Sequence, residues 1–205
     1  YADKLTSVGA EPKDIKTLAD LAGLPFTEKS ELRESQAALA PLGRHAAASI
    51  RDVVRVHASS GTTGTPSFVG LTREDKQRWT ECIARSYWCQ GLRPDDVFAM
   101  GLSIGFFVGG LPVAGAVEEI GATLLPVGTG ASDRLVASIQ AMRATVLATT
   151  PSYATYLAEI AKRDLGVDPA ALGIKRVMVG AEPGGGVPEI RARIESEWNA
   201  TCTES

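Results

Sequence analysis

Cysteine and histidine are scarce in this sequence, which contains three cysteines and two histidines in 205 residues. The cysteines, Cys82, Cys89 and Cys202, are odd in number and lack the paired spacing of metal ligands, so a zinc site has little support. Cys82 and Cys89 lie seven residues apart, a spacing that places both on one face of a helix. We expect buried, unreactive thiols at these positions.

The sequence also lacks a long apolar run and a basic run. Its most apolar region, residues 98–117, is interrupted by glycines and a proline, and no stretch reaches the length of a membrane-spanning helix. The net charge is −3 and no segment is rich in lysine and arginine, so a nucleic-acid partner is not expected. The first four residues lack a starting methionine and the profile of a signal peptide. We expect a cytoplasmic protein without a membrane partner, with upstream residues missing.

Glycine, serine and threonine are concentrated in residues 59–66, Ser-Ser-Gly-Thr-Thr-Gly-Thr-Pro. Such residues let the backbone turn sharply and bring N–H and O–H donors against one anion, which predicts a phosphate-binding loop. The loop lies between two predicted strands, residues 53–58 and 67–71. It is not a Walker A loop, because Gly61 and Gly64 are only two residues apart and no lysine follows. A plain hairpin loop is the alternative.

Downstream of this loop, strand patterns alternate with helical patterns. Strands are predicted at residues 97–100, 121–126, 145–149 and 175–179, and helices between Thr72 and Gly91 and at 132–143, 153–162 and 188–198. This alternation predicts an α/β fold, in which mainly parallel sheets are flanked by helices. Ligands of such folds bind at the carboxyl ends of the strands. The length suits one large domain or two small ones.

Residues 1–50 carry helix signals rather than strand signals. Apolar residues at near-helical spacing predict a helix over residues 13–21, which Gly23 ends. Thr27 or Ser30 is expected to cap a second helix, because acidic residues follow in its first turn.

Several polar residues beside the predicted strands have plain structural interpretations. Asp95 and Asp96 are interpreted as turn formers rather than metal ligands. Ser132 and Ser152 are interpreted as helix caps. Tyr153 faces either the core or a pocket.

Two further glycine-rich stretches allow a backbone to approach a ligand closely. In residues 101–110, glycines flank two phenylalanines, a pattern that predicts an apolar pocket wall. The alternative is a glycine-rich turn into a buried helix that runs to about Glu119. Residues 180–186 follow a predicted strand and suit the close approach of a flat ligand.

Five segments, taken in order, resemble adenylate-forming enzymes of the acyl-CoA synthetase/ligase superfamily, specifically the phenylacetate–CoA ligase branch. They are residues 57–66, 105–110, 150–154 and 180–183 and the pair Thr203-Glu204. The resemblance implies the N-terminal part of such an enzyme, with further chain beyond it. It also implies a helical scaffold segment at residues 1–50 and an incomplete α/β nucleotide- and acyl-binding core at residues 51–205.

The resemblance further implies roles for individual residues. Phosphate binding is implied for Ser59, Ser60, Gly61, Thr62, Thr63 and Gly64, and adenine binding for Gly180, Ala181, Glu182 and Pro183. The acyl pocket is implied for Phe106, Phe107 and Gly109, with Tyr153 as a further candidate. Thr203 and Glu204 are the implied catalytic pair: the hydroxyl contacts the α-phosphate of ATP, and the carboxylate helps to hold Mg²⁺.

The implied reaction is ATP-dependent activation of an aromatic or related carboxylic acid to an acyl-adenylate, followed by transfer to coenzyme A. The expected partners are the acid, ATP and coenzyme A, or an amine or carrier thiol in its place, and a homodimer is one expected assembly. One alternative is an amide-forming or carrier-loading enzyme, and another is a non-catalytic nucleotide-binding module.

Three departures from the family pattern favour the module. Thr65 stands where a lysine is common, which removes a positive charge near the phosphates. Gly184 stands where tryptophan is usual, which we interpret as open space beside the nucleotide. Ala200 stands where an aromatic residue is expected under the adenine. Because the chain stops before the ribose-binding aspartate and the C-terminal lysine of the family, the 205-residue chain alone is expected to be inefficient in adenylation.

Overall fold

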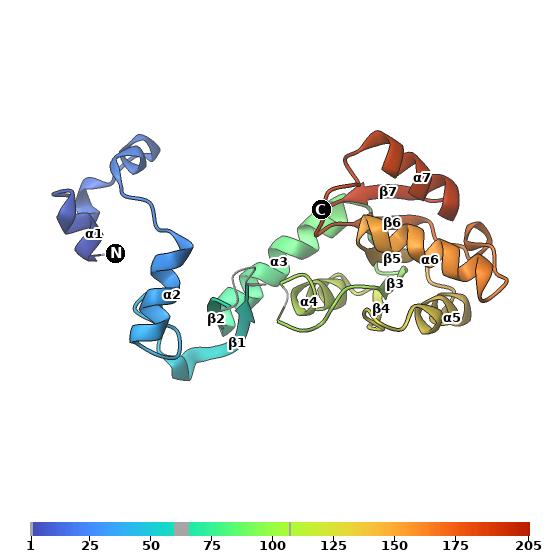
Figure 1. Cartoon of the computed structure of the whole chain (residues 1–205), viewed down its shortest axis with the longest axis horizontal. Coiled ribbons are helices and arrows are strands. Elements are labelled where there is room, and N and C mark those ends of the chain that lie inside the picture. The colour runs from blue at the N-terminus through green and yellow to red at the C-terminus, as the bar shows by residue number, and fades with distance from the viewer. Residues whose placement is uncertain (1, 60–65, 107) are drawn as a thin grey trace. The chain divides into compact units, whose positions relative to one another are not determined.

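The computed structural model describes residues 2–59, 66–106 and 108–205. The chain divides into two compact units, Tyr1–Arg73 and Glu74–Ser205, whose elements are labelled in Figure 1. The predicted division into a helical segment and an α/β core at residue 50 stays a prediction.

The first unit contains short helices and one pair of strands. The α-helices are α1 (Ala2–Ser7) and α2 (Lys29–Ala38), and three 3-10 turns lie at Pro12–Asp14, Leu18–Gly23 and Ile50–Asp52. Strands β1 (Val53–Ala58) and β2 (Phe68–Thr72) pair antiparallel, and beyond them the Ser59 N–H donates to the Ser67 carbonyl. The prediction that two strands flank the glycine-rich loop is confirmed, while residues 60–65 of that loop lie outside the described residues.

The predicted helix over residues 13–21 is wrong. The Asp20 carboxylate accepts hydrogen bonds from the N–H groups of Lys16 and Thr17, at 2.9 and 2.7 Å, and Thr17 has an extended backbone. These local bonds begin a separate turn at Leu18 and interrupt the helix. Neither 3-10 turn in this region buries a residue, so no packed face stabilises a longer helix.

The second predicted helix, α2, exists but has a different cap. It follows Glu28 rather than Thr27 or Ser30, and the Glu28 N–H donates to the Glu31 carboxylate at 2.7 Å. The Lys4 ammonium donates to the same carboxylate at 2.6 Å. The longer glutamate side chain therefore reaches back to the helix start, which makes a hydroxyl cap unnecessary.

The second unit is built on a five-stranded parallel sheet with the order β4-β3-β5-β6-β7. The strands are β3 (Val97–Met100), β4 (Thr123–Leu125), β5 (Val146–Thr149), β6 (Arg176–Val179) and β7 (Thr201–Glu204). All four neighbouring pairs in this sheet are parallel, as the alternation of strands and helices predicts. The predicted α/β fold is confirmed.

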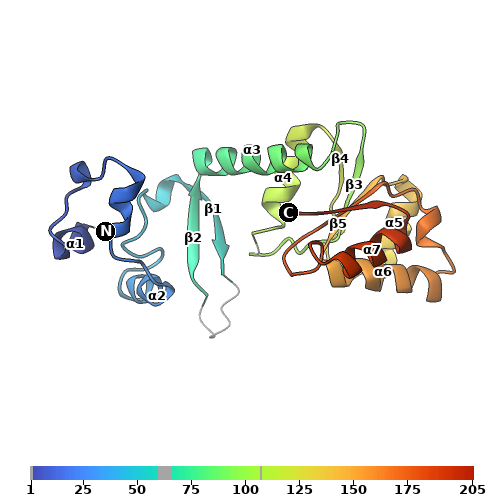
Figure 2. The ribbon, with the colours of Figure 1, turned by 90° about the horizontal axis from the view of Figure 1, so that it is seen from above.

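Helices cover both faces of this sheet (Figure 2). Helices α3 (Arg73–Cys89) and α4 (Leu111–Ile120) pack on one face, and α5 (Ser132–Met142), α6 (Pro151–Arg163) and α7 (Pro188–Trp198) pack on the other. Helix α4 confirms that the glycine-rich stretch at residues 101–110 leads into a helix. Within the described ranges, none of the helices combines the length and the apolarity required to cross a membrane.

Each of the three central strands, β3, β5 and β6, supplies side chains to two separate cores. Phe98 and Met100 of β3 pack towards α3 and α4, whereas Ala99 packs towards α5. On β6, Met178 faces the first of these cores, while Val177 faces the second. Since successive strand residues point to opposite faces, burial on both sides requires a continuous apolar run rather than an alternating one.

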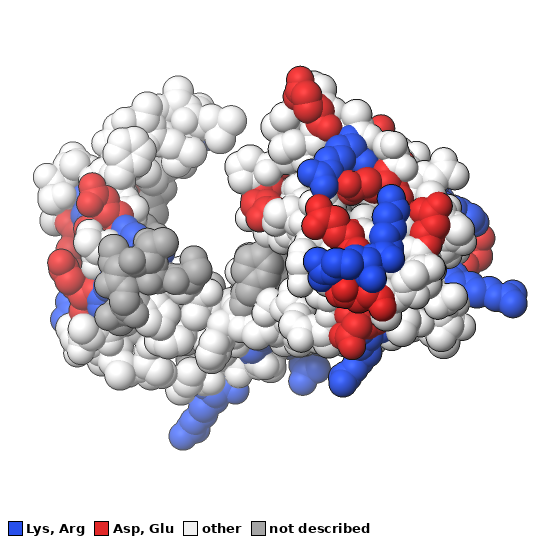
Figure 3. Space-filling view, turned by 45° about the vertical axis from the view of Figure 1, so that its right-hand side comes forward, with Lys and Arg blue, Asp and Glu red and all other residues white. Residues whose placement is uncertain are grey.

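Charged side chains lie on the outer surface of this unit, where basic and acidic groups are interspersed (Figure 3). Arg193 of α7 contacts Glu159 of α6 at 3.2 Å and Glu197 of its own helix at 2.8 Å. The side chains of Arg193 and Glu159 are more than half exposed, so these pairs contribute little to stability.

Three expectations about single residues in this unit are wrong. Helix α6 is capped by Thr150, which accepts the Tyr153 N–H at 3.3 Å, and not by Ser152. Ala131 precedes α5, so Ser132 is its first residue rather than its cap. Of the three cysteines, only Cys202 is buried. Cys82 and Cys89 are exposed, because α3 buries the side that carries Ala84 and Tyr87.

The interpretation of Asp96 as a turn residue is confirmed. Its carboxylate accepts the Arg93 N–H at 2.9 Å and the Thr145 hydroxyl at 2.7 Å, and the residue is 5% exposed. These bonds hold the turn before β3 against the start of β5.

A substitution at Trp198 would test how much the core between the sheet and α7 contributes to stability. Its side chain is fully buried, and its indole N–H donates to the Ala154 carbonyl at 3.1 Å. The substitution Trp198→Phe removes this bond and part of the packed volume, so we expect a loss of about 2 kcal/mol in the free energy of unfolding. Urea denaturation measures it. The control Trp88→Phe, at a ring that is 47% exposed, should cost less than about 0.5 kcal/mol, and equal losses would contradict the prediction.

Candidate functional site

The parallel sheet places the carboxyl ends of all five strands at one edge. The chain leaves β3 towards β4 on one side of the sheet, and it leaves the neighbouring strand β5 towards β6 on the other side. The loops after β3 and β5 therefore diverge, and this divergence leaves a crevice at the sheet edge.

A pocket of about 310 Å³ lies at this edge. It is lined by residues of α3, α4 and the ends of β5 and β6, together with the loop after β3: Tyr87, Leu102, Val108, Gly109, Val113, Thr149, Met178, Val179, Gly180, Ala181 and Ser205. Most of these side chains are apolar, and the polar groups are the hydroxyls of three residues and the backbone near Gly180. An apolar cavity with a few polar groups is typical of a small-molecule site.

The two central strands are held together at the mouth of the crevice. The Thr149 hydroxyl lies 3.5 Å from the Gly101 carbonyl oxygen, and the Gly101 N–H donates to the Ala148 carbonyl at 2.8 Å. A Cβ atom at Gly101 would lie 3.0 Å from a methyl group of Leu135 and 3.4 Å from the Thr149 hydroxyl. Glycine at this position therefore permits the close approach of the two strand ends.

Tyr87 forms part of the buried wall of the pocket. Its side chain is 4% exposed, and its ring centroid lies 5.8 Å from that of Phe98. Burial raises the pKa of Tyr87 to about 12, so the phenol stays protonated at physiological pH.

The loop after β6 contains the predicted adenine-binding residues, of which Gly180 and Ala181 line the pocket and Glu182 and Pro183 do not. Ala181 has a φ angle of 71°, a left-handed conformation that costs energy for a residue with a Cβ atom. The next residue, Glu182, anchors the loop, because its carboxylate accepts the Ser152 N–H at the start of α6 at 2.7 Å. Hydrogen bonds from Ser152, first from its side chain and then from its backbone, lower the pKa of Glu182.

Thr203 and Glu204 point to opposite sides of β7. The Thr203 hydroxyl donates to the Gln90 side-chain oxygen at 2.8 Å, next to the end of α3. Glu204, the last residue of the strand, lies against the glycine-rich loop on the other side, where a Cβ atom at Gly186 would be 2.8 Å from its carboxylate. Glycine in the loop therefore leaves room for this carboxylate. The catalytic role of the pair stays a prediction.

One carboxylate at the carboxyl edge of the sheet, that of Glu204, is suited to binding Mg²⁺. Mg²⁺ in nucleotide sites is commonly held by one or two carboxylates together with substrate phosphates, and Glu204 offers one exposed carboxylate at the sheet edge. Across residues 2–59, 66–106 and 108–205, no group of three or more His, Cys, Asp or Glu side chains is arranged to hold a metal.

Among the predicted acyl-pocket residues, Gly109 lines the pocket and Phe106, which is 63% exposed, does not. Phe107 lies outside the described residues. Tyr153 packs against the core on the α5 side, and its hydroxyl lies 3.0 Å from that of Ser132. No motif marks Tyr87 as a pocket residue, although helical spacing places it on the apolar side of α3.

The predicted phosphate-binding residues belong to the first unit. Ser59 is described, and its hydroxyl accepts the Ser67 N–H at 3.1 Å. Ser60, Gly61, Thr62, Thr63 and Gly64 lie outside the described residues.

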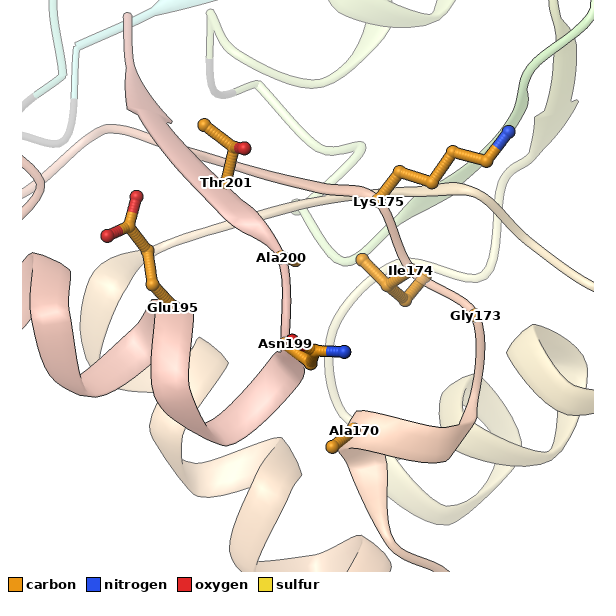
Figure 4. Close-up of a pocket in the computed structure, with 8 residues that line it drawn as sticks. All are labelled: Ala170, Gly173, Ile174, Lys175, Glu195, Asn199, Ala200 and Thr201. Atoms are coloured by element: carbon orange, nitrogen blue, oxygen red, sulfur yellow. The ribbon is translucent and has the colours of Figure 1, made fainter.

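The structure changes the interpretation of two departures from the family pattern. A Cβ atom at Gly184 would lie 2.6 Å from Pro151, so the side-chain position of residue 184 is filled by the start of α6 and is not open space. Ala200 precedes β7 at its amino end, in a second, open pocket of about 710 Å³ on the opposite edge of the sheet. Figure 4 shows this pocket, where Lys175 and Glu195 point away from each other. Neither Gly184 nor Ala200 therefore indicates that a nucleotide contact has been lost at the carboxyl edge of the sheet.

Comparison with known proteins identifies a family. The family model described as "AMP-binding enzyme" matches residues 2–194. The chain is 41% identical to phenylacetate-coenzyme A ligase of Thermus thermophilus over 89% of the chain and 40% of that protein. It is 37% identical to the enzyme of the same name from Pseudomonas putida over 95% of the chain and 43% of that protein. The chain thus spans about two fifths of the length of these curated relatives.

A solved structure supports the same fold. A 2-hydroxyisobutyryl-CoA ligase, crystallised with 2-HIB-AMP and CoA in the thioesterification state, superimposes with a TM-score of 0.93 and 34% identity. The match covers the whole chain and 43% of that protein.

Glu182 should make the stability of the second unit depend on pH. Because the pKa of its carboxyl is lowered in the folded state, the carboxylate stabilises the fold above the unfolded-state pKa, near 4.5, and this contribution is lost as the pH falls through the folded-state pKa. We expect Glu182→Gln to be less stable than the wild type at pH 7, with a difference that shrinks towards pH 3. Urea denaturation across this range measures it. A constant difference, or the same change in the exposed control Glu119→Gln, would contradict the assignment.

Proposed function

The chain belongs to the AMP-binding enzyme family, and from this premise we propose that a protein containing it is an ATP-dependent acid–coenzyme A ligase. Its substrate is an aromatic or related compact carboxylic acid. The acid is activated as an acyl-adenylate and then transferred to the thiol of coenzyme A.

One observation carries this proposal: the chain shares 41% identity with a phenylacetate-coenzyme A ligase over 89% of its length. The pocket supports the acid class, because about 310 Å³ is near the lower end of the range for small-molecule sites and its walls are mainly apolar. The solved ligase with a bound acyl-adenylate and CoA supports the reaction type.

The chemistry requires alignment more than covalent participation. An oxygen of the acid attacks the α-phosphorus of ATP, the new O–P bond forms, and the bond to pyrophosphate breaks. The sulfur of coenzyme A then attacks the acyl carbon and AMP leaves, while the thiol proton is released. Two anions that repel must be held together in the first step, and fixed donors that neutralise their charge lower its barrier.

The residues of this chain divide the task in the proposed enzyme. The loop from Ser59 to Gly64 donates to the departing phosphates, and the backbone of Gly180 and Ala181 contacts the adenine. The anchored carboxylate of Glu182 holds that backbone in its left-handed turn before the nucleotide arrives. Such preorganisation reduces the entropy lost on binding. Glu204 would supply a ligand for Mg²⁺, which neutralises phosphate charge when bound.

Two alternatives differ from the ligase in their acceptor or their chemistry. An amide-forming or carrier-loading enzyme would make the same adenylate and pass it to an amine or a carrier thiol. A non-catalytic nucleotide-binding module would bind ATP without acid-dependent chemistry, and Thr65 in place of a common lysine is the departure that favours it.

Acid-dependent exchange of pyrophosphate into ATP tests the proposal. The full-length natural protein is assayed beside the 205-residue chain, with a panel of aryl, arylacetic and amino acids. We expect exchange by the full-length protein with one class of acid, and then CoA-dependent thioester formation with that acid. ATP binding without exchange for any acid would overturn the ligase and leave the binding module. Transfer of the acyl group from the adenylate to an amine or a carrier thiol, and not to CoA, would identify the first alternative.

Two variants distinguish the roles of Thr203 and Glu204 in that assay. Glu204→Gln should lower the exchange rate about 100-fold at a fixed Mg²⁺ concentration while leaving the thermal unfolding temperature nearly unchanged, because its carboxylate is exposed. Thr203→Val keeps the shape but removes the bond to Gln90, which should cost about 1 kcal/mol of stability. A comparable 100-fold loss in Thr203→Val would give this residue a catalytic role. Full activity in Glu204→Gln would remove it from the metal site.

A further inference from the structure

The buried wall of the pocket contains one side chain that is much larger than its neighbours. Tyr87 is 4% exposed, Val113 is 5% exposed and Met178 is 2% exposed, whereas Val108 on the same pocket is 46% exposed. The pocket therefore has an enclosed inner part and an open outer part. The phenol ring of Tyr87 takes up more of the inner part than a valine or methionine side chain could.

Packing fixes the position of this ring. It lies in a tilted arrangement against Phe98, with centroids 5.8 Å apart, in the core on the α3 side of the sheet. Because Tyr87 is buried in that core, its ring cannot turn aside to admit a longer ligand without disturbing the packing.

The opposite wall of the pocket is also closely packed. Gly180 lies against Ser205, since a Cβ atom there would be 3.0 Å from the serine hydroxyl. The depth of the pocket is thus set between α3 and the end of β6.

We propose that Tyr87 is a specificity-determining residue that limits the length of the carboxylic acid, with its ring, which is fixed by packing against Phe98, as the inner boundary of the pocket. This inference rests on the proposed function, in which the acid enters this pocket. It assigns the preference for compact acids to one side chain on α3, a helix that precedes the sheet.

Acid-length profiles of three variants test the inference in the full-length protein. The kcat/KM for acid-dependent pyrophosphate exchange is measured at saturating ATP for aryl and straight-chain acids of increasing length. In Tyr87→Leu, acids two or three carbons longer than the best wild-type substrate should gain about tenfold or more relative to that substrate. In Tyr87→Phe, which keeps the ring, the length preference should persist.

Two further variants protect this test against a folding defect. Tyr87→Met keeps an apolar side chain with a flexible, unbranched shape and should produce a smaller shift in the same direction. The control Tyr156→Leu, at a tyrosine that is 46% exposed and does not line the pocket, should leave the profile unchanged.

The outcomes separate this inference from the proposed function. Wild-type exchange with an unchanged length profile in Tyr87→Leu and Tyr87→Met would overturn the inference alone. A wild-type protein that supports no acid-dependent exchange would overturn the proposed function and the inference together.

Discussion

The burial of both faces of a parallel sheet is the constraint on which the second unit depends. A parallel strand must be followed by a crossover, and the crossover helices here bury apolar side chains on both sides of every central strand. The same arrangement brings all carboxyl ends to one edge, and that edge opens into a crevice where the chain leaves β3 and β5 towards opposite sides of the sheet. Core packing and pocket formation therefore have a common cause, because the residues at the carboxyl ends of the strands also form part of the pocket walls.

The loops at this edge are fixed by polar contacts that the sheet itself does not supply. Glu182 bonds to the start of α6, and the Arg191 guanidinium donates to the Gly185 carbonyl at 2.6 Å. Ala181, which directly precedes these anchors, has a left-handed conformation. A strained residue persists only where its surroundings determine its position, and strain of this kind is common at binding sites. The loop after β6 is thus built to present its backbone in one conformation.

Sequence reasoning succeeded where one physical signal dominated. The alternation of apolar strands with helices predicted the parallel sheet, since burial on both faces leaves a continuous apolar run in each strand. It failed where a side chain had two local options. Ser152 is a good cap, but Thr150 stands one position before Pro151 and takes that role. The expected helix at residues 13–21 failed because Asp20 bonds backward to the chain, and no tertiary face favours the helix over that turn. Helical spacing places Tyr87 on the apolar side of α3, but such spacing does not tell whether a buried side chain also lines a pocket.

The alternation of side chains along β7 limits what Thr203 and Glu204 can do together. Adjacent residues of a strand point to opposite faces. As long as β7 runs through Glu204, the Thr203 hydroxyl faces Gln90 on the α3 side while the carboxylate faces the loop on the α7 side. Both groups could contact one nucleotide only if it reached across the strand end. A sequence match for two neighbouring residues carries no information about this, because the match is the same in a strand and in a loop. The carboxylate of Glu204 is therefore better supported as a ligand of Mg²⁺ than Thr203 and Glu204 together are as a catalytic pair. In the proposed enzyme, the length of the acid is limited by Tyr87, a residue that no motif marks.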